Sequence, residues 1–304
     1  ILAQEVCEKP GTSSRELLTA ALEKETGARW SSASVLAHKA WEGTPDEADE
    51  HVAVFARGEL ANAKGTVHRA QSALARVMIG ATVEAPSTVA GTRTRVRVVS
   101  IHLDHADATV RAAQAREVAS AAMIEAESEA VDADGATVLP VLVAGDFNAR
   151  DGSDALGAMK AFGFVEASGS AGSTRIDHVF VHRSAPLAPA DHQLLFTGAD
   201  AVSDHPGILA RFTPSAGTPV RLTRVIATGA QGSLYVRGNA PPLDWVRGWP
   251  AFPRGAAGEI ALVTSEIPAG AFAFKFLRGD VDWQIGEDAA GAGEADTRIT
   301  PVFP

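Results

Sequence analysis

One stretch decides the fold that we expect for this chain: Val138-Leu139-Pro140-Val141-Leu142-Val143-Ala144-Gly145-Asp146-Phe147-Asn148. A short apolar run bounded by polar residues is typical of a buried strand. The run ends at a glycine, which is followed by a carboxylate and, two residues later, by an amide. In α/β proteins, polar side chains at the ends of buried strands commonly form the functional site. The stretch therefore predicts a site residue, Asp146, at the end of a buried strand.

Four more polar clusters lie at the ends or starts of predicted strands. They are Gln4-Glu5, Ile101-His102-Leu103, Asp177 within Arg175–Val181, and Ser203-Asp204-His205. Taken singly, each cluster fits a solvated turn or a helix cap as well as it fits a site. Five such clusters in one chain favour a shared site made of carboxylates, imidazoles and an amide.

Composition limits the class of protein. The chain has 304 residues with a net charge of −10, 46% hydrophobic residues and one cysteine, Cys7. It is long enough for about two domains, and a single cysteine excludes an intrachain disulfide. No apolar run is long enough for a transmembrane helix, so we expect a soluble protein, for which secretion is one option. Affinity for nucleic acid comes largely from basic residues that neutralise phosphates, so the acidic balance disfavours a simple nucleic-acid binder.

The texture of the sequence changes at Thr213–Pro219, a stretch of small residues bounded by prolines that resembles a linker. We expect one domain over 1–213, a linker over 214–218 and a second domain over 219–304. The first domain mixes strands with helices predicted over 13–26 and 108–131, whereas the second shows only short strands separated by Gly/Pro turns. In the first helix, Leu17, Leu18, Ala21 and Leu22 form an apolar face.

The five clusters, in their order along the chain, resemble those of the endonuclease/exonuclease/phosphatase superfamily. The most specific parts are Gly145-Asp146-Phe147-Asn148 and Ser203-Asp204-His205. The resemblance covers residues 1–213 and implies a four-layer α/β sandwich of the pancreatic-deoxyribonuclease type. The first strand of that fold would precede residue 1, so we expect it to be missing.

The resemblance also implies roles for the site residues. Glu5 and Asp204 would hold a Mg²⁺ ion, with Mn²⁺ or Ca²⁺ as alternatives. Asp146 would orient or deprotonate the attacking water, and Asn148 would donate to a phosphoryl oxygen. His205, oriented by Asp177, and His102 would bind or protonate phosphate oxygens. Arg76 would contact the phosphate.

The substrate stays open among the classes of this superfamily. Cys7 stands where pancreatic-type nucleases present an arginine to the DNA groove, and the only tyrosine lies outside residues 1–213, so recognition of duplex DNA in that manner is disfavoured. A phosphosphingolipid would require an exposed apolar loop, for which Trp245–Trp249 is the candidate. A nucleic acid, a phosphosphingolipid and a small or sugar phosphate therefore remain as alternatives.

The second domain resembles the starch-binding modules appended to amylases, which are small antiparallel β-sandwiches. Trp245 and Trp283 each follow a strand on a loop, and Lys275 lies in Phe272-Ala273-Phe274-Lys275-Phe276. The resemblance places all three residues on a sugar site, where exposed indoles stack on the apolar faces of sugar rings. Two tryptophans buried in the core are the alternative.

Two classes of function follow. The first is a metal-dependent phosphoesterase with an appendage that binds α-glucan. The second is a binding protein whose catalytic domain has degenerated. The sequence gives no oligomeric state.

Overall fold

The computed structural model describes residues 1–86, 93–130, 138–169, 175–255 and 258–304. The chain forms two compact units. The first comprises Ile1–Ala115, Pro140–Leu156 and Val165–Gly217, and the second comprises Arg116–Leu139, Gly157–Phe164 and Thr218–Pro304. In the part of the chain that is described, no helix has the length and apolar character needed to cross a membrane.

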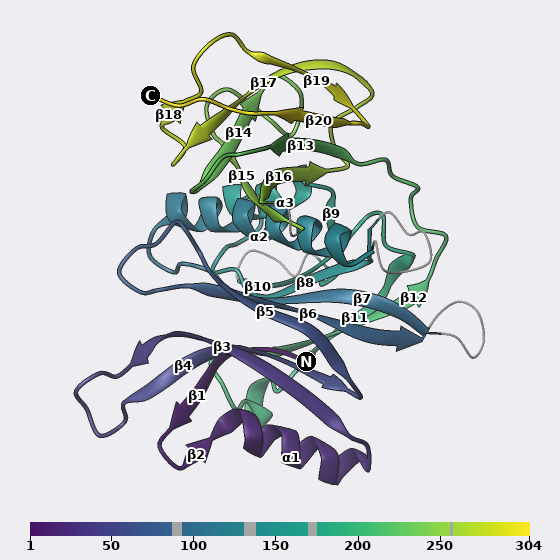
Figure 1. The fold of residues 1–304 in the computed structure, drawn as a ribbon. Coiled ribbons are helices and arrows are strands. Elements are labelled where there is room, and N and C mark those ends of the chain that lie inside the picture. The colour runs from purple at the N-terminus through teal and green to yellow at the C-terminus, as the bar shows by residue number, and fades with distance from the viewer. Residues whose placement is uncertain (87–92, 131–137, 170–174, 256–257) are drawn as a thin grey trace. The chain divides into compact units, whose positions relative to one another are not determined.

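The first unit contains an antiparallel sheet in the order β2-β1-β4-β3, with helix α1 beside it (Figure 1). Its elements are β1 (Leu2–Lys9), β2 (Thr12–Ser13), α1 (Ser14–Thr26), β3 (Trp30–Ala40) and β4 (Ala48–Arg57). The helix begins where Ser13 Oγ accepts a hydrogen bond from the Glu16 amide at 3.0 Å, and it ends at Gly27, whose φ of 62° closes the last turn.

A second sheet has the order β5-β6-β7-β8-β10-β9. Its strands are β5 (Leu60–Val67), β6 (Val77–Pro86), β7 (Arg93–His102), β8 (Val141–Asp146), β9 (Phe164–Glu166) and β10 (Asp177–His182). β7 runs parallel to β8, and β10 runs antiparallel to it. Asp146, at the end of β8, therefore pairs with His102 on one side and with Asp177 on the other.

The core of the first unit forms where the two sheets stack face to face (Figure 1). Val52 and Val54 of β4 pack against side chains of β6 and β7, and these are Val77, Ile79, Ala81, Val96 and Val98. Side chains alternate between the two faces of a strand, so Glu50 lies on the same face of β4 as Val52 and Val54.

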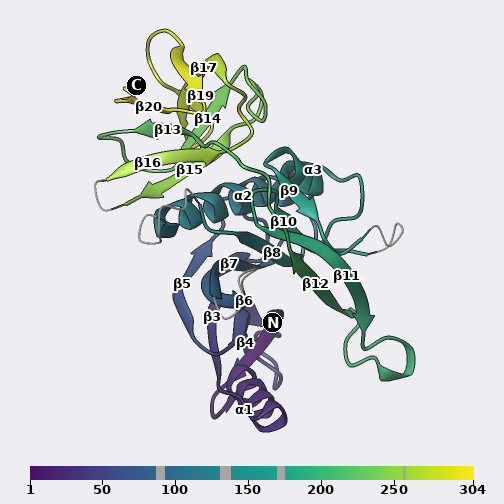
Figure 2. The same ribbon diagram turned by 90° about the vertical axis from the view of Figure 1, so that its right-hand side faces the viewer.

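A long hairpin completes the first unit (Figure 2). It consists of β11 (Leu187–Leu195) and β12 (Gly207–Pro214), which pair antiparallel from Leu195↔Gly207 to Leu187↔Pro214. The loop between the strands contains a short 3₁₀ helix, Gly198–Asp200, and the predicted cluster Ser203-Asp204-His205. The Ser203-Asp204-His205 cluster therefore lies in the loop that connects the two strands of the hairpin.

The second unit contains a sheet in the order β18-β17-β14-β15-β16-β13-β20, with β19 paired to β17. Its strands are β13 (Thr223–Ala227), β14 (Leu234–Gly238), β15 (Trp249–Arg254), β16 (Glu259–Thr264), β17 (Gly270–Arg278), β18 (Asp282–Trp283), β19 (Ala289–Gly293) and β20 (Asp296–Ile299). β13 and β20 run parallel, so this sheet is mixed, whereas we expected antiparallel strands.

Segments from the middle of the chain belong to this second unit. Helix α2 (Ala108–Ala130) contributes residues 116–130, and α3 (Asp154–Ala161) contributes residues 157–161. Glu127 of α2 is 3% exposed and accepts hydrogen bonds from Arg254 at 2.7 and 3.0 Å and from Arg224 at 3.0 Å. Phe162 stacks on Trp249, with ring centroids 4.5 Å apart. The C-terminal strands are therefore bound to an α-helix that precedes them by about 100 residues.

The predicted elements compare with the structure as follows. Both predicted helices are present, α1 over Ser14–Thr26 and α2 over Ala108–Ala130. The predicted apolar face of α1 is wrong for Leu17, Leu18 and Ala21, which are exposed, because only Leu22 reaches the cluster around Val6 and Phe55. The division into 1–213, 214–218 and 219–304 stays a prediction, although the second unit resumes at Thr218, within the expected linker.

Candidate functional site

A pocket of about 410 Å³ lies in the first unit. It is lined by residues from β1, from the end of β8, from the start of β10 and from the hairpin loop. These include Gln4, Glu5, Gly145, Asp146, Asp177, Phe196, Val202, Ser203, Asp204 and His205. Four of the five predicted clusters therefore contribute residues to one cavity, and His102 pairs directly with Asp146 beside it.

Asp146, Asp177 and His205 form the first group in this pocket. The ligating atoms of the three side chains lie within 4.8 Å of one another. His205 Nδ1 is 2.9 Å from Asp177 Oδ2, the distance of a charge-assisted hydrogen bond. Asp146 Oδ1 accepts a 2.7 Å hydrogen bond from the amide of Asn148. This group can hold a proton on an imidazole and accept one on a carboxylate.

The environment shifts the pKa values of all three groups. Burial raises the pKa of Asp146 to about 6, and the nearby Asp177 carboxylate adds to the increase. Burial also raises the pKa of Asp177, against the opposing charge of His205. For His205, burial disfavours the charged ring, but Asp177, Asp146 and Asp204 outweigh it and raise the pKa above its ordinary value. At neutral pH the pocket therefore holds an ionised Asp146 beside a His205 ring whose protonated form is favoured by the surrounding carboxylates.

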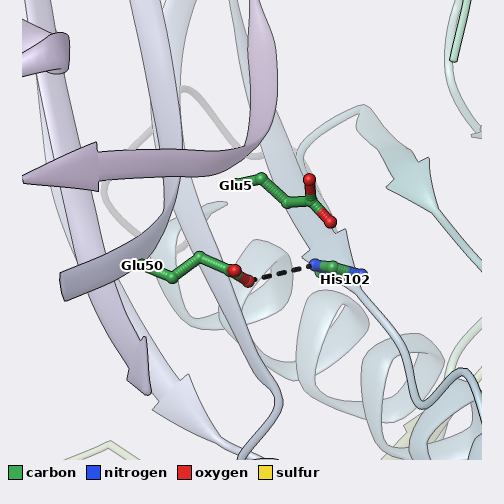
Figure 3. A group of neighbouring side chains, drawn as sticks. All are labelled: Glu5, Glu50 and His102. Carbon is green, nitrogen blue, oxygen red and sulfur yellow. Dashed lines mark ion pairs between the residues drawn. The ribbon is translucent and has the colours of Figure 1, made fainter. Parts of the chain in front are cut away.

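Glu5, Glu50 and His102 form a second group, on β1, β4 and β7 (Figure 3). Glu5 projects from a bulge in β1 with a φ of 55°, and its carboxylate points toward His102. Glu50 Oε1 lies 3.7 Å from His102 Nδ1 and is buried without a hydrogen-bond partner. Burial raises the pKa of Glu50, and the neighbouring Glu5 adds to the increase.

Arg76 sets the state of the His102 ring. Its guanidinium is buried and donates to Nδ1 of His102 and to Nδ1 of His105, both at 3.1 Å. Burial, followed by the charge of Arg76, lowers the pKa of His102 to about 3, so the ring is neutral. Because Nδ1 accepts a hydrogen bond, the ring proton lies on Nε2, which is 3.5 Å from Asp146 Oδ2. The Glu50 contact drawn in Figure 3 therefore joins a carboxyl group to a neutral ring.

Asn148 is held by the backbone. Its side-chain amide donates to the carbonyl of Leu103 at 3.0 Å, and its own φ is 49°. An amide has two N–H donors, and this bond uses one of them. The predicted donation to a phosphoryl oxygen stays a prediction, and Asn148 is not among the residues that line the pocket.

His178 and Glu166 support the turn that follows Asp146. His178 Nδ1 is 2.7 Å from Glu166 Oε1, and its Nε2 is 2.8 Å from the carbonyl of Ala149. Arg175 in turn donates to Glu166 at 3.0 Å. Asp151 completes a cluster of metal-ligand type with Glu166 and His178, but both ring nitrogens of His178 are already engaged by oxygen atoms. We assign this cluster a structural role.

The oxygen donors of the pocket fit a divalent cation. Carboxylate oxygens are the preferred ligands of Mg²⁺, and Glu50 Oε1 is an orphaned buried acceptor beside Glu5. Glu5 and Asp204 line the same pocket, but Glu5 groups with Glu50 and His102, whereas Asp204 lies on the hairpin loop beside His205. Ligation of one ion by Glu5 and Asp204 together stays a prediction.

Sequence reasoning missed Glu50. The signal was the period-two pattern of β4, because Glu50, Val52 and Val54 alternate onto one face and all three are buried. Burial of a carboxylate on a strand face costs free energy unless a charged group, a hydrogen-bond donor or a metal ion compensates it.

Comparison with known proteins defines the family. The model of the "Endonuclease/Exonuclease/phosphatase family" matches residues 28–205, more than half of the chain. The chain belongs to the endonuclease/exonuclease/phosphatase family. Members of this family are metal-dependent hydrolases of phosphate esters, and so is this protein. The matched residues include His102, Asp146, Asp177 and His205, whereas Glu5 lies before them.

Solved structures of the endonuclease/exonuclease/phosphatase family share the fold. A family protein from Leptotrichia buccalis C-1013-b is 16% identical, with a TM-score of 0.52 over 70% of this chain and 86% of that one. The protein from Bacteroides vulgatus is 19% identical, with a TM-score of 0.50 over 70% of this chain and 83% of that one. A search of curated proteins found no match.

In the second unit, the three residues of the predicted sugar site lie as follows. Trp245 and Trp283 are 37% and 38% exposed, with ring centroids 6.3 Å apart and ring planes inclined by 33°. The Arg237 guanidinium lies 5.2 Å from the centroid of the Trp283 ring. Lys275 Nζ donates to the carbonyl of Gly286 at 2.7 Å. Trp249, in contrast, is 4% exposed, so the expected apolar loop Trp245–Trp249 presents only one of its two indoles.

Proposed function

We propose that the pocket hydrolyses a phosphodiester by attack of water on phosphorus. The observation that supports this most directly is the grouping of Asp146, Asp177 and His205 within one cavity. Asp146, with its pKa near 6, is ionised at neutral pH and remains basic enough to take a proton from the attacking water. As the P–O bond to the leaving group breaks, His205 gives a proton to the departing oxygen, and Asp177 holds the ring in place.

His102 acts as a neutral donor in this proposal. Its Nε2–H faces the Asp146 side of the pocket, because Arg76 occupies Nδ1. A neutral imidazole can donate a hydrogen bond from Nε2 to a phosphoryl oxygen without transferring its proton. Glu5, Glu50 and Asp204 would hold the divalent ion, which when bound neutralises charge that develops on the phosphate oxygens.

The acidic lining of the pocket agrees with a requirement for a cation. Glu5, Asp146, Asp177 and Asp204 line the cavity, and no lysine or arginine is among the described lining residues. A phosphate anion would meet net repulsion there unless a cation accompanied it.

Hydrolysis of bis(p-nitrophenyl) phosphate with Mg²⁺ or Mn²⁺ tests the proposal. We expect turnover that chelator abolishes and that His205→Ala lowers by about 10²- to 10⁴-fold, the usual contribution of a general acid or base. His192→Ala, an exposed histidine on β11 outside the pocket, is the matched control and should keep full activity. Full activity of His205→Ala would contradict the mechanism.

A second function, binding of α-glucan, is supported by the exposed pair Trp245 and Trp283. Two neighbouring indoles offer flat apolar faces of the kind on which sugar rings stack. Migration in gels that contain amylose or glycogen tests the idea. The wild-type protein should be retarded, Trp283→Ala should not be, and Trp41→Ala, an exposed tryptophan of the first unit, should behave as wild type. Unretarded migration of the folded wild-type protein would contradict sugar binding.

A further inference from the structure

The hairpin loop places an apolar wall beside the catalytic groups. Phe196 follows β11 directly, is 53% exposed and lines the pocket, as do Val202, which is 81% exposed, and Ile208. Together these side chains form an apolar patch beside the carboxylates of the pocket, and an apolar patch in a cleft is a candidate ligand contact. No motif in the sequence pointed to Phe196.

The backbone of Phe196 is strained in the same way as two residues of the site. Among the described residues, seven that are not glycine have a positive φ, and these include Glu5 at 55°, Asn148 at 49° and Phe196 at 57°. A bulky side chain is disfavoured in this conformation, which persists where the surrounding structure enforces it and which clusters at functional sites. Phe196 therefore shares a left-handed backbone with Glu5 and Asn148, and the other four such residues, Trp41, Asn62, Asp280 and Glu294, lie outside the pocket.

Gly207 fixes the position of the ring. A Cβ atom added to Gly207 would lie 3.3 Å from Cδ2 of Phe196, so the ring packs on the bare backbone of this glycine. Gly207 comes two residues after His205, and both line the pocket. The aromatic ring is thus held beside the strand end that carries the proposed proton donor.

The charge of the pocket limits the substrate further. Four carboxylates line it without a lysine or arginine among the described lining residues, so the successive phosphates of a nucleic-acid backbone would find no basic side chain to neutralise them there. A substrate with a single phosphate needs only the one divalent ion that the carboxylates would hold. The apolar wall could then contact the organic group that is esterified to this phosphate.

We propose that Phe196 is a specificity-determining residue that stacks on a planar aromatic ring carried by a small phosphodiester with one phosphate. This inference rests on the proposed phosphodiesterase function and names its substrate class. Stacked ring pairs are worth about 0.5–1.5 kcal/mol beyond the area that they bury, which corresponds to a preference of roughly 2- to 12-fold.

Two substrates test the inference, one with a flat aromatic ring and one with a puckered saturated ring of six carbons. They are methyl benzyl phosphate and methyl cyclohexylmethyl phosphate, with kcat/KM followed by chromatography of the products in the presence of Mg²⁺. We expect the wild-type protein to prefer the benzyl ester by roughly 3- to 10-fold. Phe196→Leu, which keeps an apolar side chain without a flat ring, should reduce this ratio to about 1. The ratio is independent of the fraction of variant that folds, since both rates come from one preparation.

Leu194→Ala provides the matched control, because Leu194 is an exposed apolar residue of the same hairpin that does not line the pocket, and it should keep the wild-type ratio. Methyl thymidine 5′-phosphate distinguishes the source of the ring: faster turnover than the benzyl ester indicates a nucleoside, and slower turnover indicates an aryl alcohol. Equal rates for the two six-membered rings in the wild-type protein, or a ratio that Phe196→Leu leaves intact, would overturn the inference while the phosphodiesterase function stands. Failure to hydrolyse any diester, bis(p-nitrophenyl) phosphate included, would instead count against the proposed function.

Discussion

Replacing Asp146 with asparagine should stabilise the first unit at alkaline pH while it removes activity. The Asp146 side chain is 9% exposed, and burial raises the pKa of its carboxyl group from an ordinary 3.8 to about 6. The folded protein therefore binds this proton more tightly than the unfolded chain does. The associated stability is fully present below pH 3.8 and is lost as the pH rises through about 6, which costs about 3 kcal/mol at about 1.4 kcal/mol per pH unit.

Asparagine has nearly the same shape and carries no charge at any of these pH values. Its carbonyl can still accept the hydrogen bond from the Asn148 amide, although a neutral acceptor gives up about 1 kcal/mol relative to a carboxylate. We therefore expect Asp146→Asn to raise the free energy of unfolding by about 1–2 kcal/mol at pH 8. Between pH 8 and pH 4.5 this advantage should shrink by about 2 kcal/mol.

Differential scanning calorimetry in the presence of chelator measures the effect as the difference in Tm between Asp146→Asn and the wild-type protein at each pH. Asp46→Asn is the control, since the side chain of Asp46 is 83% exposed and its replacement should change little at either pH. A destabilised Asp146→Asn at pH 8, or an effect of equal size at both pH values, would refute the account of Asp146 as a buried carboxylate that is ionised at a cost.

Three further outcomes are expected. Activity on bis(p-nitrophenyl) phosphate should fall below about pH 6 as Asp146 takes up a proton, and an acid limb near pH 4 would contradict this role. Asp177→Asn should move the alkaline limb of the pH profile to lower pH, because His205 loses the neighbouring charge that raises its pKa. An unchanged alkaline limb would show that the limb does not report the titration of His205. Glu127→Ala should lower the free energy of unfolding of the second unit by about 3–5 kcal/mol, because two guanidinium groups lose their buried carboxylate, and urea titration against exposed Glu25→Ala checks the difference.

The sequence was informative where a polar site residue lies directly at the end of an apolar strand. The period and length of residues 138–148 predicted the strand that delivers Asp146, and β8 ends at that residue. The family resemblance supplied the rest of the site, and the family assignment is confirmed by the match over residues 28–205.

The sequence was uninformative where tertiary context decides. β15 was missed because Pro250 and Pro253 interrupt it, and prolines normally argue against a strand. β11 was missed because six of its residues are exposed and no apolar alternation marks it. The period-two pattern of β4 places Glu50 on a buried face, but it does not identify His102 as the neighbouring side chain. Phe196 is likewise marked only by the pocket that the fold forms beside it, and no local pattern predicts that pocket.

The second compact unit is assembled from three separated stretches of chain, two of which lie inside the span of the family match. The second unit is therefore not an independent module that recombination at the linker could transfer to another protein. A gene segment that encodes residues 219–304 would leave behind the carboxylate that neutralises Arg224 and Arg254 and the aromatic ring that covers Trp249. During synthesis on the ribosome, residues 116–139 and 157–164 emerge long before the strands that complete their unit. These two segments can therefore reach their final packing only after the C-terminal strands have been synthesised.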